Sequence, residues 1–290
     1  MFGNLDMRRL AAMCVGGMAV LALLFSGSGP AAAEDGRLYL ALGDSVVFGY
    51  ITQAGFEYGN PHNFIGYPDY VGRSLRMTTT NASCPGEATG GFISLTSPDD
   101  NGCRGFRAQA PLHVSYPTSQ PQLDFATSFL AAHRNTRLVT IGLGANDAFI
   151  LERTCNLDAT CIQNGLPAVL ATIGANMHTI LHALRGTGFH GVLMVVNYYS
   201  LDYSNLAATG LTTLLNQAVT ASAQADGAVV ADEFTAFQKA ASATGGKTCM
   251  AGLLNASPVD QFTCDVHPSQ SGQQLLAATV ENAYEAAISR

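Results

Sequence analysis

A short apolar run that ends in a serine constrains the fold of this chain more than any other feature. Residues Leu38–Leu42 are continuously apolar, which is typical of a strand buried on both faces of a parallel sheet. Gly43, Asp44 and Ser45 follow directly, so the hydroxyl of Ser45 is expected at the carboxyl end of that strand. In open α/β sheets this edge is where ligands bind. The sequence therefore predicts a functional role for Ser45.

Strand-like and helix-like segments alternate through the rest of the chain. Four more short, β-rich apolar runs are predicted to be strands: Leu75–Thr79, Leu138–Leu143, Gly191–Asn197 and Ala228–Ala231. Apolar residues at helical spacing predict helices over Gln120–Arg134, Leu166–Leu184, Leu206–Ala225 and Ser269–Ser289. This alternation is typical of an α/β fold, in which a parallel sheet carries helices on both faces.

Two long stretches interrupt the alternation. Val46–Asp69 is rich in glycine and aromatic residues, and Gly86–Pro121 is rich in proline. Loops of this length in a compact domain are usually functional or disordered. The aromatic residues favour an ordered wall near Ser45, and the alternative is a surface loop that packs on itself. The aromatic residues of the first stretch are Phe48, Tyr50, Phe56, Tyr58, Phe64 and Tyr67.

The first residues have the pattern of an export signal. Arg8 and Arg9 precede an almost unbroken apolar run over residues 10–25, and three alanines at 31–33 offer a cleavage site. The run has about 16 residues, whereas a membrane span needs about 20, so cleavage is expected and an uncleaved anchor is the alternative. We predict a signal peptide over residues 1–33, a single domain over residues 34–290, and a secreted or cell-envelope location.

The chain that would remain after cleavage is acidic and rich in apolar residues. The signal segment holds two of the 14 basic residues and one of the 21 acidic residues, so its removal shifts the net charge from −7 to −8. No basic run is present to pair with phosphates, which argues against a nucleic-acid partner. Hydrophobic residues make up 48% of the chain and charged residues 12%, a composition that suits a well-buried core.

Six cysteines follow the signal segment, and an even number in an exported chain is typical of disulfides. Pairing between neighbours is the simplest connectivity: Cys84–Cys103, Cys155–Cys161 and Cys249–Cys264. Each such bond is expected to stabilise the fold by about 2–4 kcal/mol. The alternative is a zinc site. The sequence has no Cys-x-x-Cys motif and no histidine at ligand spacing from a cysteine pair, so we expect no metal.

A serine hydroxyl is a weak nucleophile until a base removes its proton. The best candidate base is His267, which precedes the last predicted helix and is expected in a loop at a sheet edge. Asp265, two residues earlier, could orient the imidazole and stabilise the imidazolium. An Asp-x-His pair also occurs in ordinary polar loops, so the pair assigns no function by itself.

Two further residues that follow predicted strands could stabilise a negative intermediate. Asn146 offers a side-chain amide N–H, and Gly86 offers a backbone N–H without side-chain obstruction. Each also has a structural explanation, Asn146 as a turn or helix cap and Gly86 as a turn after Pro85. Asp44 is expected to cap or brace the turn that presents Ser45.

Four short motifs, in order along the chain, resemble those of the SGNH, or GDSL, hydrolases. Gly43–Gly49 is similar to the first block of that family, and Gly86, within Cys-Pro-Gly-Glu, to the second. Gly144–Asp147 is similar to the third block and His267–Pro268 to the fifth. The resemblance extends from about Leu38 to the last predicted helix.

The resemblance implies a flavodoxin-like, three-layer α/β/α sandwich around about five parallel strands. It implies Ser45 as nucleophile, His267 as base, and the N–H groups of Ser45, Gly86 and Asn146 as oxyanion donors, with no cofactor. The family's carboxylate usually lies three residues before the histidine, where this chain has Cys264. Two hypotheses therefore remain open: Asp265 orients His267, or a backbone carbonyl does.

Together these features predict an exported serine hydrolase that cleaves carboxylic esters, as an esterase or lipase does, through an acyl-enzyme on Ser45. The expected partners are small-molecule, lipid or glycan esters, and a peripheral contact with envelope lipid is compatible with them. One alternative is acyl transfer to a second alcohol. Another is a non-catalytic envelope protein that holds lipid or glycan on the same fold. The sequence sets neither the ester nor the oligomeric state.

Overall fold

The computed structural model describes residues 36–52, 54–257 and 263–289. The predicted signal segment, with Cys14, lies outside these described residues. The described residues belong to one compact unit. None of the helices in this part of the chain combines the length and the apolarity that crossing a membrane requires.

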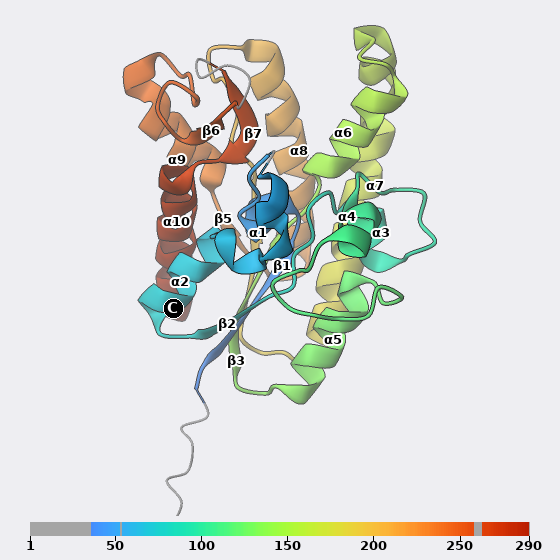
Figure 1. The fold of residues 1–290 in the computed structure, drawn as a ribbon, viewed down its shortest axis with the longest axis vertical. Coiled ribbons are helices and arrows are strands. Elements are labelled where there is room, and N and C mark those ends of the chain that lie inside the picture. Colours follow the sequence, from blue (N-terminus) through green and yellow to red (C-terminus); the bar gives the residue numbers. More distant parts are fainter. Residues whose placement is uncertain (1–35, 53, 258–262, 290) are drawn as a thin grey trace, which may run out of the picture. The chain divides into compact units, whose positions relative to one another are not determined.

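A five-stranded sheet forms the centre of the unit (Figure 1). Its strands, in the spatial order β2-β1-β3-β4-β5, are β1 Leu38–Gly43, β2 Thr78–Asn81, β3 Thr136–Gly142, β4 Val192–Val196 and β5 Val229–Ala231. All neighbouring strands pair in parallel. Because the chain moves from β1 to one side for β2 and to the other side for β3, the sheet has its topological switch point at β1.

Helices lie between and after the strands (Figure 1). The α-helices are α1 Ser45–Phe48, α2 Tyr67–Leu75, α3 Thr89–Ile93, α4 Cys103–Gln109, α5 Gln122–Ala132, α6 Ala145–Thr154, α7 Ala159–Gly186, α8 Leu206–Ala225, α9 Glu233–Ala240 and α10 Gln270–Ile288. Short 3-10 helices are η1 Gly55–Gly59, η2 Pro61–Asn63 and η3 Ala241–Thr244. Strands β6 Leu254–Ala256 and β7 Cys264–Pro268 form a separate antiparallel pair.

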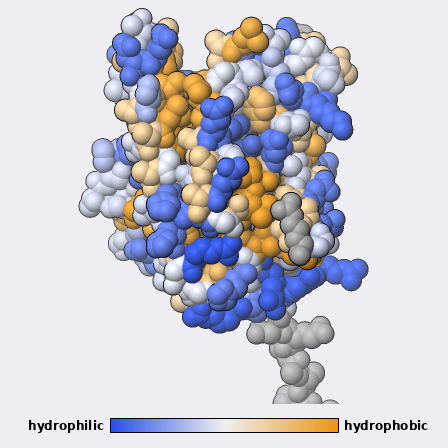
Figure 2. All heavy atoms as spheres, turned by 180° about the vertical axis from the view of Figure 1, so that it is seen from behind, coloured by the Kyte–Doolittle hydropathy of each residue, from blue (hydrophilic) through white to orange (hydrophobic). Residues whose placement is uncertain are grey.

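Two clusters of buried apolar side chains hold the layers together. One joins the sheet to α3, α5, α7 and α8, and the other joins the opposite face to α2, α9 and α10. Alternate residues of β1 enter different clusters, Leu40 and Leu42 the first and Tyr39 and Ala41 the second. The predicted α/β/α sandwich is therefore confirmed. Figure 2 shows several hydrophobic areas among hydrophilic side chains on the face turned away from the view of Figure 1.

Two predicted elements differ from those of the structure. The predicted strand Leu75–Thr79 is wrong in its first part, because α2 extends through Leu75 and β2 begins only at Thr78. Gly66 donates its N–H to Asp69 Oδ2 at 3.0 Å, which stabilises the start of α2. Helix α7 begins at Ala159 rather than Leu166, since its first turns are mostly exposed and carry no apolar pattern.

Short helices occur in the described residues of both long stretches. In the first, Phe48, Phe64 and Tyr67 are buried, and the Tyr67 hydroxyl donates to Thr140 Oγ1 at 3.2 Å in the core. Phe56, in contrast, is 91% exposed. The segment thus both packs on the core and presents an aromatic ring to solvent.

The three disulfides of the structure join the neighbouring cysteines, Cys84–Cys103, Cys155–Cys161 and Cys249–Cys264. The first ties the turn after β2 to the start of α4, and the second joins the end of α6 to α7. The third connects β7 to the segment before β6. Each bond fixes a connection outside the central sheet.

The close approach of β1 and β3 gives a stability prediction. Gly43 pairs with Gly142 and has a φ of +140°, and a Cβ there would lie 2.3 Å from the Gly142 carbonyl oxygen. Strain and overpacking should make Gly43→Ala less stable by about 2–4 kcal/mol, measured by urea denaturation. The control is Gly210→Ala, in open space on α8, which should gain up to about 1 kcal/mol. Equal stability of the two variants would contradict the explanation.

Candidate active site

The turn between β1 and α1 presents Ser45. The backbone of Asp44 is extended and its side chain caps α1, with Oδ1 accepting the N–H of Val46 at 2.9 Å. Ser45 is the first residue of the helix, so its own N–H has no partner within the helix. Gly49, in the left-handed conformation, ends α1 after a single turn. As predicted, Asp44 braces the turn.

The carboxylate of Asp44 also connects this turn to two other strand ends. Its Oδ2 accepts the hydroxyl of Tyr198, after β4, at 2.7 Å and the amide of Asn146, after β3, at 3.3 Å. Burial raises the pKa of Asp44 to about 6, although hydrogen bonds from Tyr198 and Val46 oppose the rise. No motif in the sequence pointed to this role of Tyr198.

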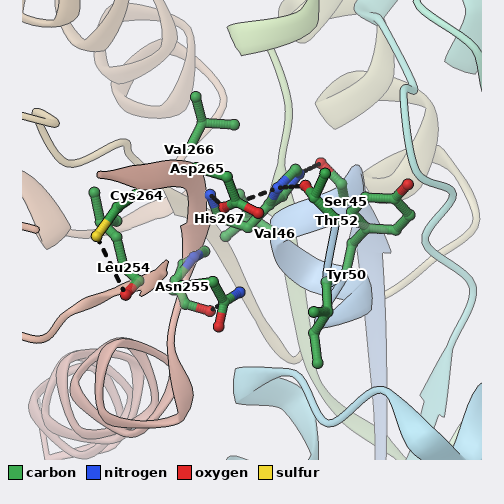
Figure 3. A network of polar contacts seen from close by, with 12 residues as sticks. Ser45, Val46, Tyr50, Thr52, Leu254, Asn255, Cys264, Asp265, Val266 and His267 are labelled. Atoms are coloured by element: carbon green, nitrogen blue, oxygen red, sulfur yellow. Dashed lines mark hydrogen bonds and ion pairs between the residues drawn. The ribbon is translucent and has the colours of Figure 1, made fainter. Parts of the chain in front are cut away.

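The structure brings Ser45 and His267 together. His267 Nε2 lies 3.0 Å from Ser45 Oγ, across 222 positions of sequence, and Figure 3 shows the imidazole between Asp265 and Ser45. The prediction that His267 lies in a loop is wrong, because it belongs to β7. This strand is held by the Cys249–Cys264 disulfide and by the Tyr199 hydroxyl, which donates to the Val266 carbonyl at 2.6 Å.

Two side chains contact Nδ1 of His267. Asp265 Oδ1 lies 3.4 Å from it and accepts the backbone N–H of His267 at 2.6 Å. Thr52 Oγ1 lies 3.3 Å from the same ring nitrogen. Among the described residues, no backbone carbonyl contacts Nδ1 of His267. Both contacts are longer than a usual hydrogen bond, as is common before a substrate tightens the geometry.

The environment of Asp265 favours its charged form. Partial burial by itself would raise the pKa of this carboxyl, but hydrogen bonds from the side chains of His267 and Thr52 and from the His267 N–H outweigh it. The pKa therefore lies below its ordinary value. An ionised Asp265 can stabilise the imidazolium that forms when His267 takes a proton. Sequence reasoning missed Thr52, for which no motif gave a signal.

Asn146 and Gly86 reach Ser45 from opposite sides. Asn146 is the second residue of α6, and its Oδ1 accepts the side-chain amide of Asn101 at 2.7 Å. This contact orients Nδ2 toward Asp44 and leaves one of its two hydrogens for a ligand. Gly86 has a φ of +83°, and no hydrogen bond between described residues uses its N–H. Ser45, Gly86 and Asn146 line one recess, with a volume of about 300 Å³.

Two buried side chains, Gln122 and Glu87, support the turn that carries Gly86. Gln122 accepts the N–H of Gly43 at 2.7 Å and donates to the Gly43 carbonyl at 3.1 Å and to Glu87 Oε2 at 3.3 Å. Gln122 thus links the end of β1 to the turn that carries Gly86. Sequence reasoning singled out neither residue.

Aromatic side chains form one wall of the recess, as one of the two hypotheses for the first long stretch predicted. The Tyr50 ring lies 4.9 Å from the His267 ring and stacks on Tyr58. Phe106 of α4 contacts Tyr50 edge-on, and Tyr50 and Phe106 both line the recess. The wall therefore combines a surface for stacking with the hydroxyl of Tyr50.

A second cavity meets the recess at the reacting groups. It has a volume of about 190 Å³ and extends between α6 and α8. Ser45, Asn146 and His267 line both cavities. A carbonyl group at Ser45 would therefore have space on two sides.

One group of potential metal ligands occurs in the described part of the chain, formed by Cys84, Glu87 and Cys103. The two cysteines are bonded to each other, so they offer no thiolate. The group fits a structural disulfide beside a buried carboxyl rather than a metal site.

Comparisons with known proteins identify the family and the fold of this chain. The profile of the GDSL-like lipase/acylhydrolase family matches residues 41–275. Phospholipase A1 from Streptomyces albidoflavus superposes with a TM-score of 0.57 at 18% identity, over 86% of this chain and 99% of that protein. The acetylxylan esterase Axe2 from Geobacillus stearothermophilus gives a TM-score of 0.52 at 15% identity, over 86% and 94%. No curated protein matches the chain significantly. At these identities the solved structures support the fold alone.

The contacts of His267 give a prediction for the orienting group. Asp265→Asn should lower kcat by about 10⁴, because the neutral amide favours the wrong tautomer. Thr52→Val, which removes only a neutral hydroxyl, should lower kcat by about tenfold or less. Steady-state kinetics with p-nitrophenyl acetate measure both. An Asp265→Asn enzyme with more than a tenth of wild-type kcat would show that another group orients the ring.

Glu87 gives a prediction for the pH dependence of stability. Burial raises its pKa to about 8, against an ordinary value of 4.5. The folded protein therefore keeps a proton that the unfolded chain releases, and stability should fall as the pH rises from about 4.5 to about 8. Glu87→Gln, which cannot ionise, should show a smaller loss in urea denaturation at pH 5 and pH 8. The control is Asp124→Asn, an exposed carboxyl on α5. Equal losses for Glu87→Gln and wild type would contradict this.

Proposed function

Because the chain belongs to the GDSL-like lipase/acylhydrolase family, we propose that it cleaves carboxylic esters through a covalent acyl-enzyme on Ser45. Family membership makes the chain an ester-bond hydrolase. The observation that carries the serine mechanism is the 3.0 Å contact between Ser45 Oγ and His267 Nε2. It occurs at the sheet edge where Gly86 and Asn146 also line the recess.

In the first half of the reaction, His267 Nε2 accepts the hydroxyl proton as Ser45 Oγ attacks the ester carbonyl carbon. The carbonyl oxygen becomes negative and is stabilised by the N–H groups of Ser45, Gly86 and Asn146. Asp265 stabilises the imidazolium formed on His267. His267 then gives its proton to the leaving alcohol oxygen, the C–O bond breaks, and the acyl group stays on Ser45.

In the second half, water takes the place of the alcohol. His267 accepts a proton from the water as its oxygen attacks the acyl carbon, and the same N–H groups stabilise the second negative intermediate. The bond to Ser45 then breaks, and Ser45 Oγ recovers the proton from His267. The acid is released and the enzyme returns to its starting state.

The geometry favours hydrolysis over the two alternatives. A binding protein would not need a buried Asp44 that fixes Ser45 and Asn146, or an Asp265 carboxylate placed 3.4 Å from Nδ1 of His267. Acyl transfer would use the same acyl-enzyme with a second alcohol. The recess beside His267 is open and partly polar, which suits water as the acceptor.

Export is part of the same proposal. The signal-like pattern at the N-terminus and the three disulfides are what a protein folded outside the cytosol would carry. N-terminal sequencing of the protein recovered from the medium tests it. A mature chain that begins near position 34 is expected, and an intact Met1 on cell-associated protein would favour the anchor. Peripheral contact with envelope lipid stays a prediction.

The nucleophile is tested directly. Ser45→Ala should lower kcat for p-nitrophenyl acetate by a factor on the order of 10⁶, and an organophosphonate should label Ser45 of the wild type. Ser119→Ala, an exposed serine, is the matched control and should keep wild-type kcat. Retention of turnover by Ser45→Ala, or labelling at another serine only, would rule out the proposed mechanism.

A further inference from the structure

The second cavity is built from one face of each of two helices. Besides Asn146 at the reacting groups, the lining residues on α6 are Ala145, Ala148, Phe149 and Glu152, and on α8 they are Ala208, Leu211, Thr212 and Leu215. Both sets follow an i, i+3, i+4, i+7 pattern, so each set lies along one side of its helix. We call this space the α6–α8 slot.

Small residues leave the slot open. Ala148 faces it from α6 and Ala208 faces it from α8, and both are half-buried. Most of the larger side chains that these two helices contribute are apolar, with Phe149 on α6 and Leu211 and Leu215 on α8. A mostly apolar space of this kind favours hydrocarbon over water.

The slot begins at the reacting groups. Ser45, Asn146 and His267 all line it, and Val266 and Tyr199 complete this inner end. A hydrocarbon chain in the slot would therefore be attached directly to the group that reacts with Ser45. Two carboxyl groups also line the slot: Asp44 beside Ser45, and Glu152, which lies two turns along α6 from Ala145.

The other cavity, the recess, has a different character. Gly86, Asn101, Gly102 and the hydroxyl-bearing Tyr50 line it, together with the apolar side chains of Pro85, Phe106, Phe149 and Val266, of which the last two also line the slot. The leaving alcohol must depart and water must then enter on the same side of the acyl carbon. The open and partly polar recess serves both steps, whereas the more apolar slot suits the group that stays attached to Ser45 until water arrives.

From this contrast we propose that the α6–α8 slot binds the acyl chain of the substrate and that the recess receives the alcohol. An apolar protein cavity of about 150 Å³ holds a benzene molecule. The slot measures about 190 Å³, so it accommodates an acyl chain of roughly six to eight carbons. The preferred substrates are medium-chain acyl esters, and Ala148 and Ala208 set the depth of the site. This rests on the proposed function of Ser45.

A series of p-nitrophenyl esters, from acetate to palmitate, tests the chain length. Each methylene that enters the slot should raise kcat/KM by about fourfold, up to hexanoate or octanoate. Longer chains should bring no further gain, because the added carbons lie outside the slot. A profile that falls steadily from acetate would overturn the inference.

A second series distinguishes the two cavities. Here the acyl group is fixed as acetyl and the alcohol is lengthened from ethanol to octanol. If the slot holds the acyl chain, kcat/KM should change far less with the length of the alcohol than with the length of the acyl chain. A stronger dependence on the alcohol would overturn the assignment of the slot to the acyl group.

Ala208→Leu and Ala148→Leu test the slot from its two walls. Each should lower the ratio of kcat/KM for octanoate over acetate by about tenfold or more, since an added isobutyl group removes the space of several methylenes. The matched control is Ala207→Leu, one position along α8 and exposed, which should keep the wild-type ratio. Thermal unfolding confirms that each variant is folded, and the two walls give independent tests if one variant is not. An unchanged ratio in a folded slot variant contradicts the proposal.

The two levels of the hypothesis fail differently. Suppose that acetate is cleaved and that an organophosphonate labels Ser45, but that the ratio of kcat/KM for octanoate over acetate is unchanged in both slot variants. In that case only the acyl-chain inference is wrong. If Ser45→Ala retains turnover, the serine mechanism is wrong and the inference falls with it.

Discussion

The buried carboxylate of Asp44 is the interaction on which the rest of the site depends. A buried charge is costly unless it is hydrogen-bonded, and Asp44 takes its partners from three segments: the Val46 N–H, the Tyr198 hydroxyl and the Asn146 amide. The same contacts that satisfy the carboxylate fix the turn of Ser45 against the ends of β3 and β4. With its pKa raised by burial to about 6, Asp44 is mostly ionised at neutral pH and keeps accepting all three.

The strand order explains how donors surround one hydroxyl. β1 lies between β2 and β3, so the segments after its two neighbours approach Ser45 from either side. Gly86 comes from the β2 side and Asn146 from the β3 side, and the recess and the α6–α8 slot share Asn146 at their junction. A serine after an edge strand could receive only one such neighbour. The switch point of the sheet thus provides both the oxyanion donors and a cavity on each side of a bound carbonyl.

What could be predicted from the sequence has a local cause. Leu38–Leu42 is apolar on both faces, and Leu206–Ala225 carries a continuous helical pattern, so these segments became β1 and α8 almost as expected. Ser45, Asn146 and His267 were found because each belongs to a short motif. Thr52 and Gln122 could not be found, because their roles arise from contacts with residues 215 and 79 positions away. β6 and β7 were missed because short, partly exposed strands have no apolar alternation.

The place of His267 in a strand accounts for the spacing of its carboxylate. Side chains along a strand alternate, so residues two apart share a face and residues three apart do not. Asp265 and His267 therefore share one face of β7, and Asp265 Oδ1 approaches the ring while it accepts the His267 N–H. Cys264 takes the opposite face, where its disulfide to Cys249 anchors the strand. A carboxylate at position 264 would point away from the imidazole. On an extended backbone, a spacing of two residues therefore brings the carboxylate and the imidazole together. The disulfide holds this backbone in its extended conformation.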